Sequence, residues 1–230
     1  NYLIREGEEI NSFYMAKSAG VDPATGEQLY WAYKKDSEGK MIAGSEYVTN
    51  DATVAASSKY LMGSRIPDLY GSVSSALKYK GFDLNVATFG AAGYKVMDFI
   101  DRTLRGSYGA TNKSVDLVNA WTPENPSTTV PRVYWASTGS ITNDMFSSRF
   151  LQNGAYWKIA NVELGYNLPD KWFKDVISGV RVYVSGQNLA TISKYRGYNI
   201  DFAGGTFTPG YNYCSYPTPM TLMFGVNLSF

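Results

Sequence analysis

The sequence predicts an all-β fold whose strands belong to a large antiparallel β-barrel that crosses a membrane. Three observations favour this fold: a closing stretch in which apolar and polar residues alternate, connections that alternate between short and long, and 19 Tyr residues in a chain of 230. Strands of a membrane barrel turn alternate residues to lipid and to the interior, need only about 9–11 residues each, and carry aromatic girdles. We therefore expect a barrel rather than a soluble sandwich.

The closing stretch, residues 218–230, has a clear strand pattern. Its even-numbered positions are all apolar: Met220, Leu222, Phe224, Val226, Leu228 and Phe230. Successive side chains of a strand point to opposite faces, so one face of this strand is apolar and the other is mostly small or polar. The inner face of a soluble sandwich would give the same pattern. A terminal aromatic residue is common in outer-membrane barrels, however, and we interpret Phe230 as a barrel-assembly signal.

Composition argues against several classes of function. The net charge is +1 and the basic residues are scattered, so nothing points to nucleic acid as a partner. The chain has no His, and its single Cys, Cys214, cannot form an internal disulfide or a cysteine-based metal site. We expect no metal, no cofactor and no membrane-spanning helix, because no apolar run approaches about 18 residues. The first residues lack both an initiating Met and a signal-peptide pattern, so we expect a piece of a longer polypeptide.

The first part of the chain predicts two strands and a long loop. Residues 11–20 and 28–33 have strand character, and the sequence DPATG at 22–26 predicts a tight turn between them, because Pro presets a turn and Gly supplies positive φ. Residues 35–65 are polar and predict a long loop, with a short extended segment at 47–49.

The middle of the chain predicts a hairpin followed by irregular structure. Residues 67–79 and 82 to about 100 are strand-like, and Lys80-Gly81 between them fits a two-residue primed turn. Residues 101–153 contain prolines that forbid a regular central strand, although residues 115–121 fit one or two helical turns.

The last part predicts three more strands. Residues 155–168 have strand character and end at Pro169, and residues 171–176 form a short connector. Residues 180–189 alternate again. Residues 191–217 form a second long loop rich in Tyr, Gly and Pro, which leads into the closing strand.

These elements amount to about seven strands whose connections alternate in length. Short connections are expected at residues 21–26, 80–81 and 169–179, and long ones at 35–65, 101–153 and 191–217. Outer-membrane barrels have short periplasmic turns and long extracellular loops, so the alternation places Phe230 on the periplasmic side. About seven strands cannot close around a wide lumen, and open edges in lipid are unfavourable. We therefore predict that residues 1–230 form the C-terminal part of a barrel whose earlier strands are absent.

The alternation also assigns the two faces of the wall. The even-numbered residues of the closing strand would face lipid together with Val180, Val182 and Val184, whereas Arg181, Tyr183, Ser185 and Gln187 would face the lumen. A lipid-facing Arg would cost about 2–4 kcal/mol at the membrane midplane, so Arg181 is expected to point inward.

Several short motifs, taken together, resemble one family. Residues 161–169 (NVELGYNLP) are similar to the Leu-Gly-Tyr-x-Leu-Pro segment near the end of SusC/RagA-type TonB-linked outer-membrane proteins, and residues 180–189 (VRVYVSGQNL) resemble their Arg-Val-Tyr-x-Ser-x-Gln-Asn-Leu strand. Further matches are residues 20–26, 121–126, 130–132, 194–198 (KYRGY), 216–219 (YPTP) and 225–230 (GVNLSF). The family commonly continues after Tyr198 with Asp-Pro-Glu, whereas this chain has Asn-Ile-Asp-Phe, so that loop is expected to differ.

The resemblance implies a barrel of about 22 strands closed by an N-terminal plug domain, in the outer membrane of Gram-negative, Bacteroidetes-type bacteria. It implies import of oligosaccharides or oligopeptides, with a SusD-like surface lipoprotein as a lid and with energy from the TonB complex acting through the missing N-terminal part. The implied partners are therefore the lipoprotein, the TonB complex, outer-membrane lipid and the glycan or peptide cargo.

Exposed aromatic residues in the long loops are the candidate cargo contacts, because flat rings stack on sugars and hydroxyl groups bond to them. The candidates are Trp121, Trp135, Tyr195, Tyr198, Phe202, Phe207, Tyr211 and Tyr213. The alternative for each is that it packs the loop against its neighbours or against the lipoprotein.

Two other classes of function remain as alternatives. One is an enzyme such as a glycosidase with paired carboxylates, for which Asp98 and Asp101 are candidates; three residues apart on a strand they would lie on opposite faces, and we expect no enzyme. The other is a non-transporting outer-membrane barrel or a surface glycan-binding protein, which would share the strands and loops but would need no plug.

Overall fold

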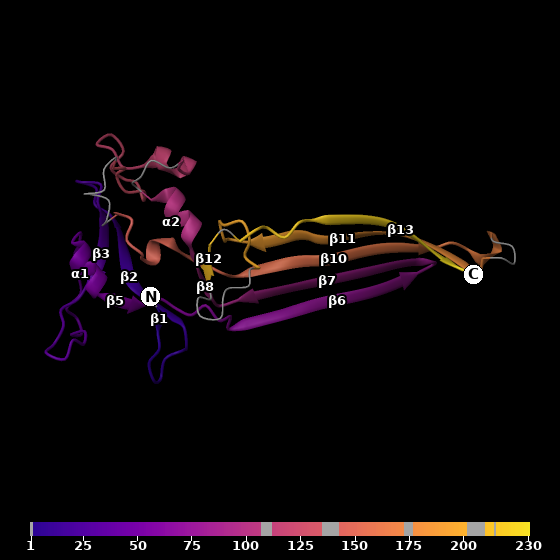
Figure 1. The fold of residues 1–230 in the computed structure, drawn as a ribbon, viewed down its shortest axis with the longest axis horizontal. Coiled ribbons are helices and arrows are strands. Elements are labelled where there is room, and N and C mark those ends of the chain that lie inside the picture. The colour runs from indigo at the N-terminus through magenta and orange to yellow at the C-terminus, as the bar shows by residue number, and fades with distance from the viewer. Residues whose placement is uncertain (1, 107–111, 135–142, 173–176, 202–209, 214) are drawn as a thin grey trace. The chain divides into compact units, whose positions relative to one another are not determined.

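The computed structural model describes residues 2–106, 112–134, 143–172, 177–201, 210–213 and 215–230 (Figure 1). The chain divides into two compact units, and each is described by itself. The mixed unit contains Asn1–Ile66, Lys95–Gln152 and Phe202–Cys214, and the long-sheet unit contains Pro67–Tyr94, Asn153–Asp201 and Ser215–Phe230.

The long-sheet unit is an antiparallel sheet of five strands in the order β13-β11-β10-β7-β6 (Figure 1). The strands are β6 (Leu69–Tyr79), β7 (Phe82–Ala92), β10 (Tyr156–Asn167), β11 (Gly179–Ser193) and β13 (Thr221–Ser229). They contain 11, 11, 12, 15 and 9 residues, so each reaches or exceeds the length of about 9–11 residues that a tilted strand needs to cross a bilayer.

Short connections join the strands at one end of this sheet. Lys80 and Gly81 turn β6 into β7 with φ angles of +46° and +87°, as a primed turn requires, and Tyr79 pairs directly with Phe82. The second short connection, between β10 and β11, includes the 3₁₀ helix η3 (Asp170–Trp172) and closes with a bond from Leu168 N to Val180 O of 2.9 Å. Ser229 pairs with Gly179, so the chain ends at the same end as both short connections (Figure 1).

The mixed unit contains two smaller sheets. Strands β1 (Tyr2–Leu3), β2 (Ser12–Val21), β3 (Gln28–Ala32) and β4 (Tyr47–Thr49) follow one another in the first sheet, and β5 (Lys59–Leu61) also pairs with β2. The second sheet has the order β12 (Tyr211–Asn212), β8 (Lys95–Asp98) and β9 (Leu151–Asn153). The described helices of the mixed unit are α1 (Ala52–Ser57), α2 (Phe99–Arg105) and the 3₁₀ helices η1 (Val115–Asn119) and η2 (Ser148–Phe150).

The mixed unit has a buried core, formed where β2 and β8 pack against η2. Phe13, Met15, Met97 and Phe150 form one cluster of buried side chains, and Tyr30 lies in a second with two alanines. Burying a side chain of this size stabilises a fold by roughly 1.5–3 kcal/mol, so this unit is held together as a globular protein is.

The first two strands expected in the barrel wall, β2 and β3, do not belong to the long sheet. Of the strands expected in one wall, five form the long sheet, and β2 and β3 pair with each other and with short strands of the mixed unit. The alternation of polar and apolar residues identifies a strand but not its partner. Adjacent residues Met15 and Ala16 are both buried, so β2 is covered on both faces, unlike a strand with one lipid-facing side.

Two further expectations about the connections were wrong. The strand expected to run to about residue 100 ends at Ala92; Gly93 follows with φ of +83°, and the chain continues into β8 and α2. Residues 35–65, expected as a loop, contain α1 and β5 besides the extended segment β4 that the sequence had indicated. Asp51 caps α1 by accepting bonds from the backbone N–H groups of Thr53 and Val54.

Within the described ranges, no helix is long and apolar enough to cross a membrane.

Candidate functional site

One face of the long sheet is apolar across all five strands. Residues paired directly across neighbouring strands share a face, so the register defines rows that run from edge to edge. One row consists of Leu77, Leu84, Leu164, Val184 and Phe224, and the adjacent row consists of Tyr79, Phe82, Tyr166, Val182 and Val226. Phe224 is 82% exposed and Leu77 is 60% exposed. An apolar surface this extended is unfavourable in water and favourable against lipid.

The opposite face carries charged and polar side chains. The Arg181 guanidinium donates from Nε to Asp83 Oδ1 at 3.0 Å and from an Nη to Glu163 Oε1 at 2.7 Å. Asp83 and Glu163 lie on β7 and β10, so this cluster ties three strands together. The register therefore confirms the prediction that Arg181 points away from the face of Val180, Val182 and Val184.

Two glycines make room for large side chains on the polar face. A Cβ at Gly165 would collide with the Arg181 guanidinium, and one at Gly225 would collide with the Tyr183 ring. Each glycine lies directly opposite Tyr183, on a different neighbouring strand. The absence of side chains at these positions lets the Arg181 guanidinium lie over Gly165 and the Tyr183 ring lie over Gly225.

A register shift places Lys158 on this polar face. The pairing of β10 with both neighbours shifts between Ile159 and Asn161, which is the signature of a β-bulge. Beyond the shift, Lys158 pairs with Phe89 of β7 and Thr191 of β11. Lys158 is only 5% exposed, and its Nζ lies 2.9 Å from Asp201 Oδ2 and 5.7 Å from the centre of the Phe89 ring. The Asp201 carboxylate thus compensates the charge of Lys158.

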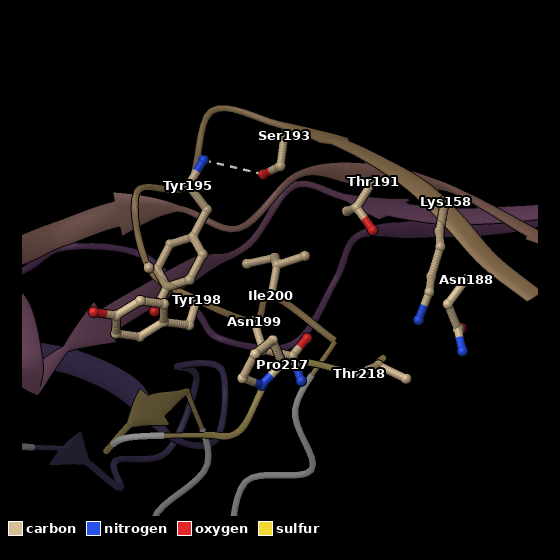
Figure 2. Close-up of a pocket in the computed structure, with 11 residues that line it drawn as sticks. Lys158, Asn188, Thr191, Ser193, Tyr195, Tyr198, Asn199, Ile200, Pro217 and Thr218 are labelled. Atoms are coloured by element: carbon tan, nitrogen blue, oxygen red, sulfur yellow. Dashed lines mark hydrogen bonds between the residues drawn. The ribbon is translucent and has the colours of Figure 1, made fainter. Parts of the chain in front are cut away.

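Beside Lys158 lies a pocket with a volume of about 210 Å³, formed by the end of β11, the segment after it and the segment before β13 (Figure 2). Figure 2 shows Lys158, Asn188 and Thr191 extending into it from the strands, with Tyr195 and Tyr198 at one flank. Tyr198 is 70% exposed, so its ring is available at the mouth.

Local hydrogen bonds fix the backbone around the pocket. The Tyr195 N–H donates to Ser193 Oγ at 3.0 Å, and the Asp201 N–H donates to Asn199 Oδ1 at 3.0 Å. Asn188 has φ of +54° and donates from Nδ2 to Pro219 O at 3.2 Å, which joins β11 to the segment before β13. Asn tolerates this left-handed conformation better than most residues.

Burial raises the pKa of Tyr94, which lies near the Lys158–Asp201 pair. The pKa of Tyr94 is raised, first by burial and then by the neighbouring Tyr156 and the Asp201 carboxylate. The Tyr94 hydroxyl therefore stays protonated well above neutral pH and remains a hydrogen-bond donor.

Known proteins resemble the chain over its whole length, although no protein-family model matches it. The TonB-dependent receptor P3 of Formosa agariphila is 31% identical over 239 residues, which include 99% of this chain. The TonB-dependent receptor SusC of Bacteroides thetaiotaomicron is 24% identical over 236 residues. The chain spans less than a quarter of both relatives, 23% of the first and 22% of the second.

Solved structures give the same result. The RagAB peptide transporter matches 100% of this chain with a TM-score of 0.81 and 29% identity, and the match covers 24% of that transporter chain. The RagAB peptide importer in its closed-closed state matches with a TM-score of 0.79 and 29% identity.

The chain is part of a SusC/RagA-type TonB-linked outer-membrane protein. Its long sheet is accordingly a section of a large antiparallel barrel in the outer membrane of Bacteroidetes-type bacteria. The apolar face is the lipid face and the face with Arg181 is the lumen face, since charged side chains are costly against lipid.

The structure brings together two of the candidate cargo residues, Tyr195 and Tyr198, in the pocket on the lumen face of this SusC/RagA-type wall. Trp135, Phe202 and Phe207 lie outside the described residues. The side chain of Phe230 is exposed beyond the end of β13.

The other three candidates lie in the mixed unit, where they make packing contacts. Trp121 covers Gly26, which has φ of +75°, and donates from Nε1 to Pro23 O at 3.0 Å. The Tyr211 ring lies 5.9 Å from that of Phe13, and the Tyr213 ring packs against Phe99. These contacts agree with the packing alternative, and Tyr213 also remains largely exposed.

Sequence reasoning missed Lys158, Asn188 and Thr191 as pocket residues. Asn188 falls within the motif that resembles the family strand, but no pattern in the sequence marks it as facing a pocket. Lys158 carried a weak signal, because a Lys between Trp157 and Ile159 in a strand must face a polar environment.

The carboxylates considered for an enzyme have structural contacts. Asp98 caps α2 by accepting from the N–H groups of Ile100 and Asp101, and Asp101 forms an ion pair with Arg105 one helical turn later. Rather than lying on opposite faces of a strand, both carboxylates lie at the start of α2, because the expected strand ends earlier.

Proposed function

We propose that the whole protein imports oligosaccharides or oligopeptides across the outer membrane. The single observation that supports this most strongly is the long sheet, with an exposed apolar face on one side and a polar face with a buried Lys and an aromatic-flanked pocket on the other. A barrel built from such strands has a polar interior through which a polar cargo can pass. The RagAB structures, described as a peptide transporter, are similar to this chain throughout.

The proposal includes strands and partners outside this chain. Among the described residues, β6 and β13 each have a single hydrogen-bonded neighbour in the long sheet, so each presents an open edge. Open edges are unfavourable in lipid, and further strands of the same barrel would pair with them. A plug domain, contact with the TonB complex and a SusD-like surface lipoprotein as lid complete the proposed importer. We expect no catalytic step.

Uptake by living cells tests this proposal. A deletion strain would be compared with the wild type for uptake of labelled neutral oligosaccharides, charged oligosaccharides and peptides. We expect the deletion strain to lose uptake of one cargo class. De-energising the TonB complex in the wild type should cause an equal loss. Wild-type uptake of every class in the deletion strain would contradict import.

The alternative is a barrel or surface protein that binds glycans without transporting them. The exposed Tyr198 ring at the mouth of the pocket is compatible with binding alone. That alternative predicts that deletion removes cargo binding at the cell surface and leaves the rate of uptake unchanged.

A further inference from the structure

We propose that the pocket beside Lys158 is a binding subsite for one uncharged, hydroxyl-rich ring of the cargo, that is, for a neutral sugar unit. The inference rests on the proposed import and adds the class of cargo to it. It is carried by the pocket's charge balance, its polar groups, its size and the ring at its mouth.

The charges beside the pocket balance each other. Lys158 is the only charged side chain among the residues that line the pocket in the described part of the chain, and Asp201 Oδ2 lies 2.9 Å from its ammonium. The pair has no net charge, so a carboxylate of a peptide or an acidic sugar gains little from the ammonium. A peptide amino terminus would meet the ammonium as a like charge. An uncharged ligand suffers neither penalty.

The pocket presents both hydrogen-bond donors and hydrogen-bond acceptors to a ligand. The Lys158 ammonium has three N–H donors, and the one hydrogen bond that it makes in the described residues is to Asp201. Within the same residues the Thr191 hydroxyl makes no hydrogen bond, and the Asn188 amide donates to Pro219 O, which leaves its carbonyl as an acceptor for a ligand. Figure 2 shows these three side chains extending toward the same space. A sugar hydroxyl both donates and accepts, so adjacent hydroxyl groups of one ring can satisfy this mixed set.

The pocket is small. A volume of about 210 Å³ is smaller than the range of roughly 300–1,000 Å³ found for sites that enclose a whole drug-sized ligand. The pocket therefore fits one ring of a longer cargo, with the remainder of the chain outside it. The exposed Tyr198 ring at the flank offers an apolar face on which the adjoining ring can stack.

Calorimetric titration of the purified full-length protein, in complex with its lipoprotein partner if one co-purifies, tests the subsite. The probes are a panel of neutral hexasaccharides of different linkage, the same panel carrying carboxylates, and a pool of peptides of similar length. Thr191→Val removes one hydroxyl at constant shape, and Thr221→Val makes the same change on the polar face outside the pocket. Tyr198→Ala removes the ring, and Tyr198→Phe keeps it.

We expect a neutral hexasaccharide to bind, with affinity reduced about two- to tenfold by Thr191→Val and by Tyr198→Ala, and unchanged by Thr221→Val and Tyr198→Phe. Equal affinity in all four variants, with uptake of neutral sugars intact, would overturn the subsite and leave import standing. Binding of peptides or carboxylated sugars alone would overturn the neutral-sugar class and also leave import standing. A full-length protein that binds no probe and whose deletion changes no uptake would contradict both proposals. Thermal unfolding of each variant shows that it is folded.

Discussion

Replacing Val162 by Arg tests the assignment of the lipid face most sharply. Val162 lies on the central strand β10, paired with Val86 of β7 and Gly186 of β11. Val86 is four residues from the hairpin end of β7, which corresponds to about 13 Å along the strand at roughly 3.3 Å per residue. With a strand tilt of about 40°, the depth is about 10 Å, near the middle of an apolar band about 25 Å tall.

At this depth an Arg costs about 2–4 kcal/mol in a barrel wall. Since about 1.4 kcal/mol changes an equilibrium constant tenfold, Val162→Arg should lower the folded-to-unfolded ratio about 30- to 900-fold. The matched control is Gln187→Arg, which introduces the same side chain on the opposite face, where Gln187 pairs with Asn161 and Thr221.

The assay is a urea titration of the full-length barrel in lipid vesicles, followed by tryptophan fluorescence, with the free energy of unfolding compared among the wild type and both variants. We expect the control to lie within about 0.5 kcal/mol of the wild type, as surface substitutions usually do. If Gln187→Arg lowers the free energy of unfolding as much as Val162→Arg does, the assignment of the lipid face and the lumen face is wrong.

Three more predictions follow from individual contacts. Gly165→Ala should lower the free energy of unfolding by about 1–3 kcal/mol, because its Cβ displaces the Arg181 guanidinium from its carboxylates, whereas Gly71→Ala, with open space at its Cβ, should change it little in the same titration. Burial raises the pKa of Tyr30 above its ordinary value of 10.0, so the contribution of its protonated hydroxyl to stability is complete below pH 10 and falls by about 1.4 kcal/mol per pH unit above it. Tyr30→Phe should remove this loss when the free energy of unfolding is measured as a function of pH. An equal decrease of the free energy of unfolding with pH in both proteins would contradict the prediction. Deleting Phe230 should reduce assembly into the outer membrane, measured as the amount of heat-modifiable barrel in membrane fractions, and normal amounts would exclude an assembly-signal role.

The long sheet was largely predictable because each of its strands shows its pattern locally. The closing strand and the Lys80-Gly81 hairpin need only side-chain alternation and a turn that tolerates positive φ. The face of Arg181 follows from the same alternation combined with the cost of a charge in lipid.

The pairing of β2 and β3 was not predictable on these grounds. Both strands have strand-like sequences, but their place in the mixed unit depends on contacts with distant segments, such as that of Phe13 with Phe150. Such tertiary contacts leave no periodic signal within either strand.

The pocket was predictable only in part. Tyr195 and Tyr198 were found because aromatic residues gather in one loop. Lys158 and Asp201 are 43 residues apart in sequence, and the register shift next to Ile159 that sets the position of Lys158 has no clear sequence marker. Asn188 owes its position to a left-handed backbone conformation that is equally hard to foresee.

Blocking the polar face of the long sheet tests whether this face lines the path of an imported cargo. Gln187→Cys would be made in a Cys214→Ser background, which removes the one cysteine of residues 1–230, and cells would be treated with a bulky water-soluble maleimide before cargo uptake is measured. Labelled Gln187→Cys cells are expected to lose uptake, whereas Cys214→Ser cells treated in the same way keep it. Unchanged uptake by cells whose Gln187→Cys protein is fully labelled, as judged by mass spectrometry, would contradict it.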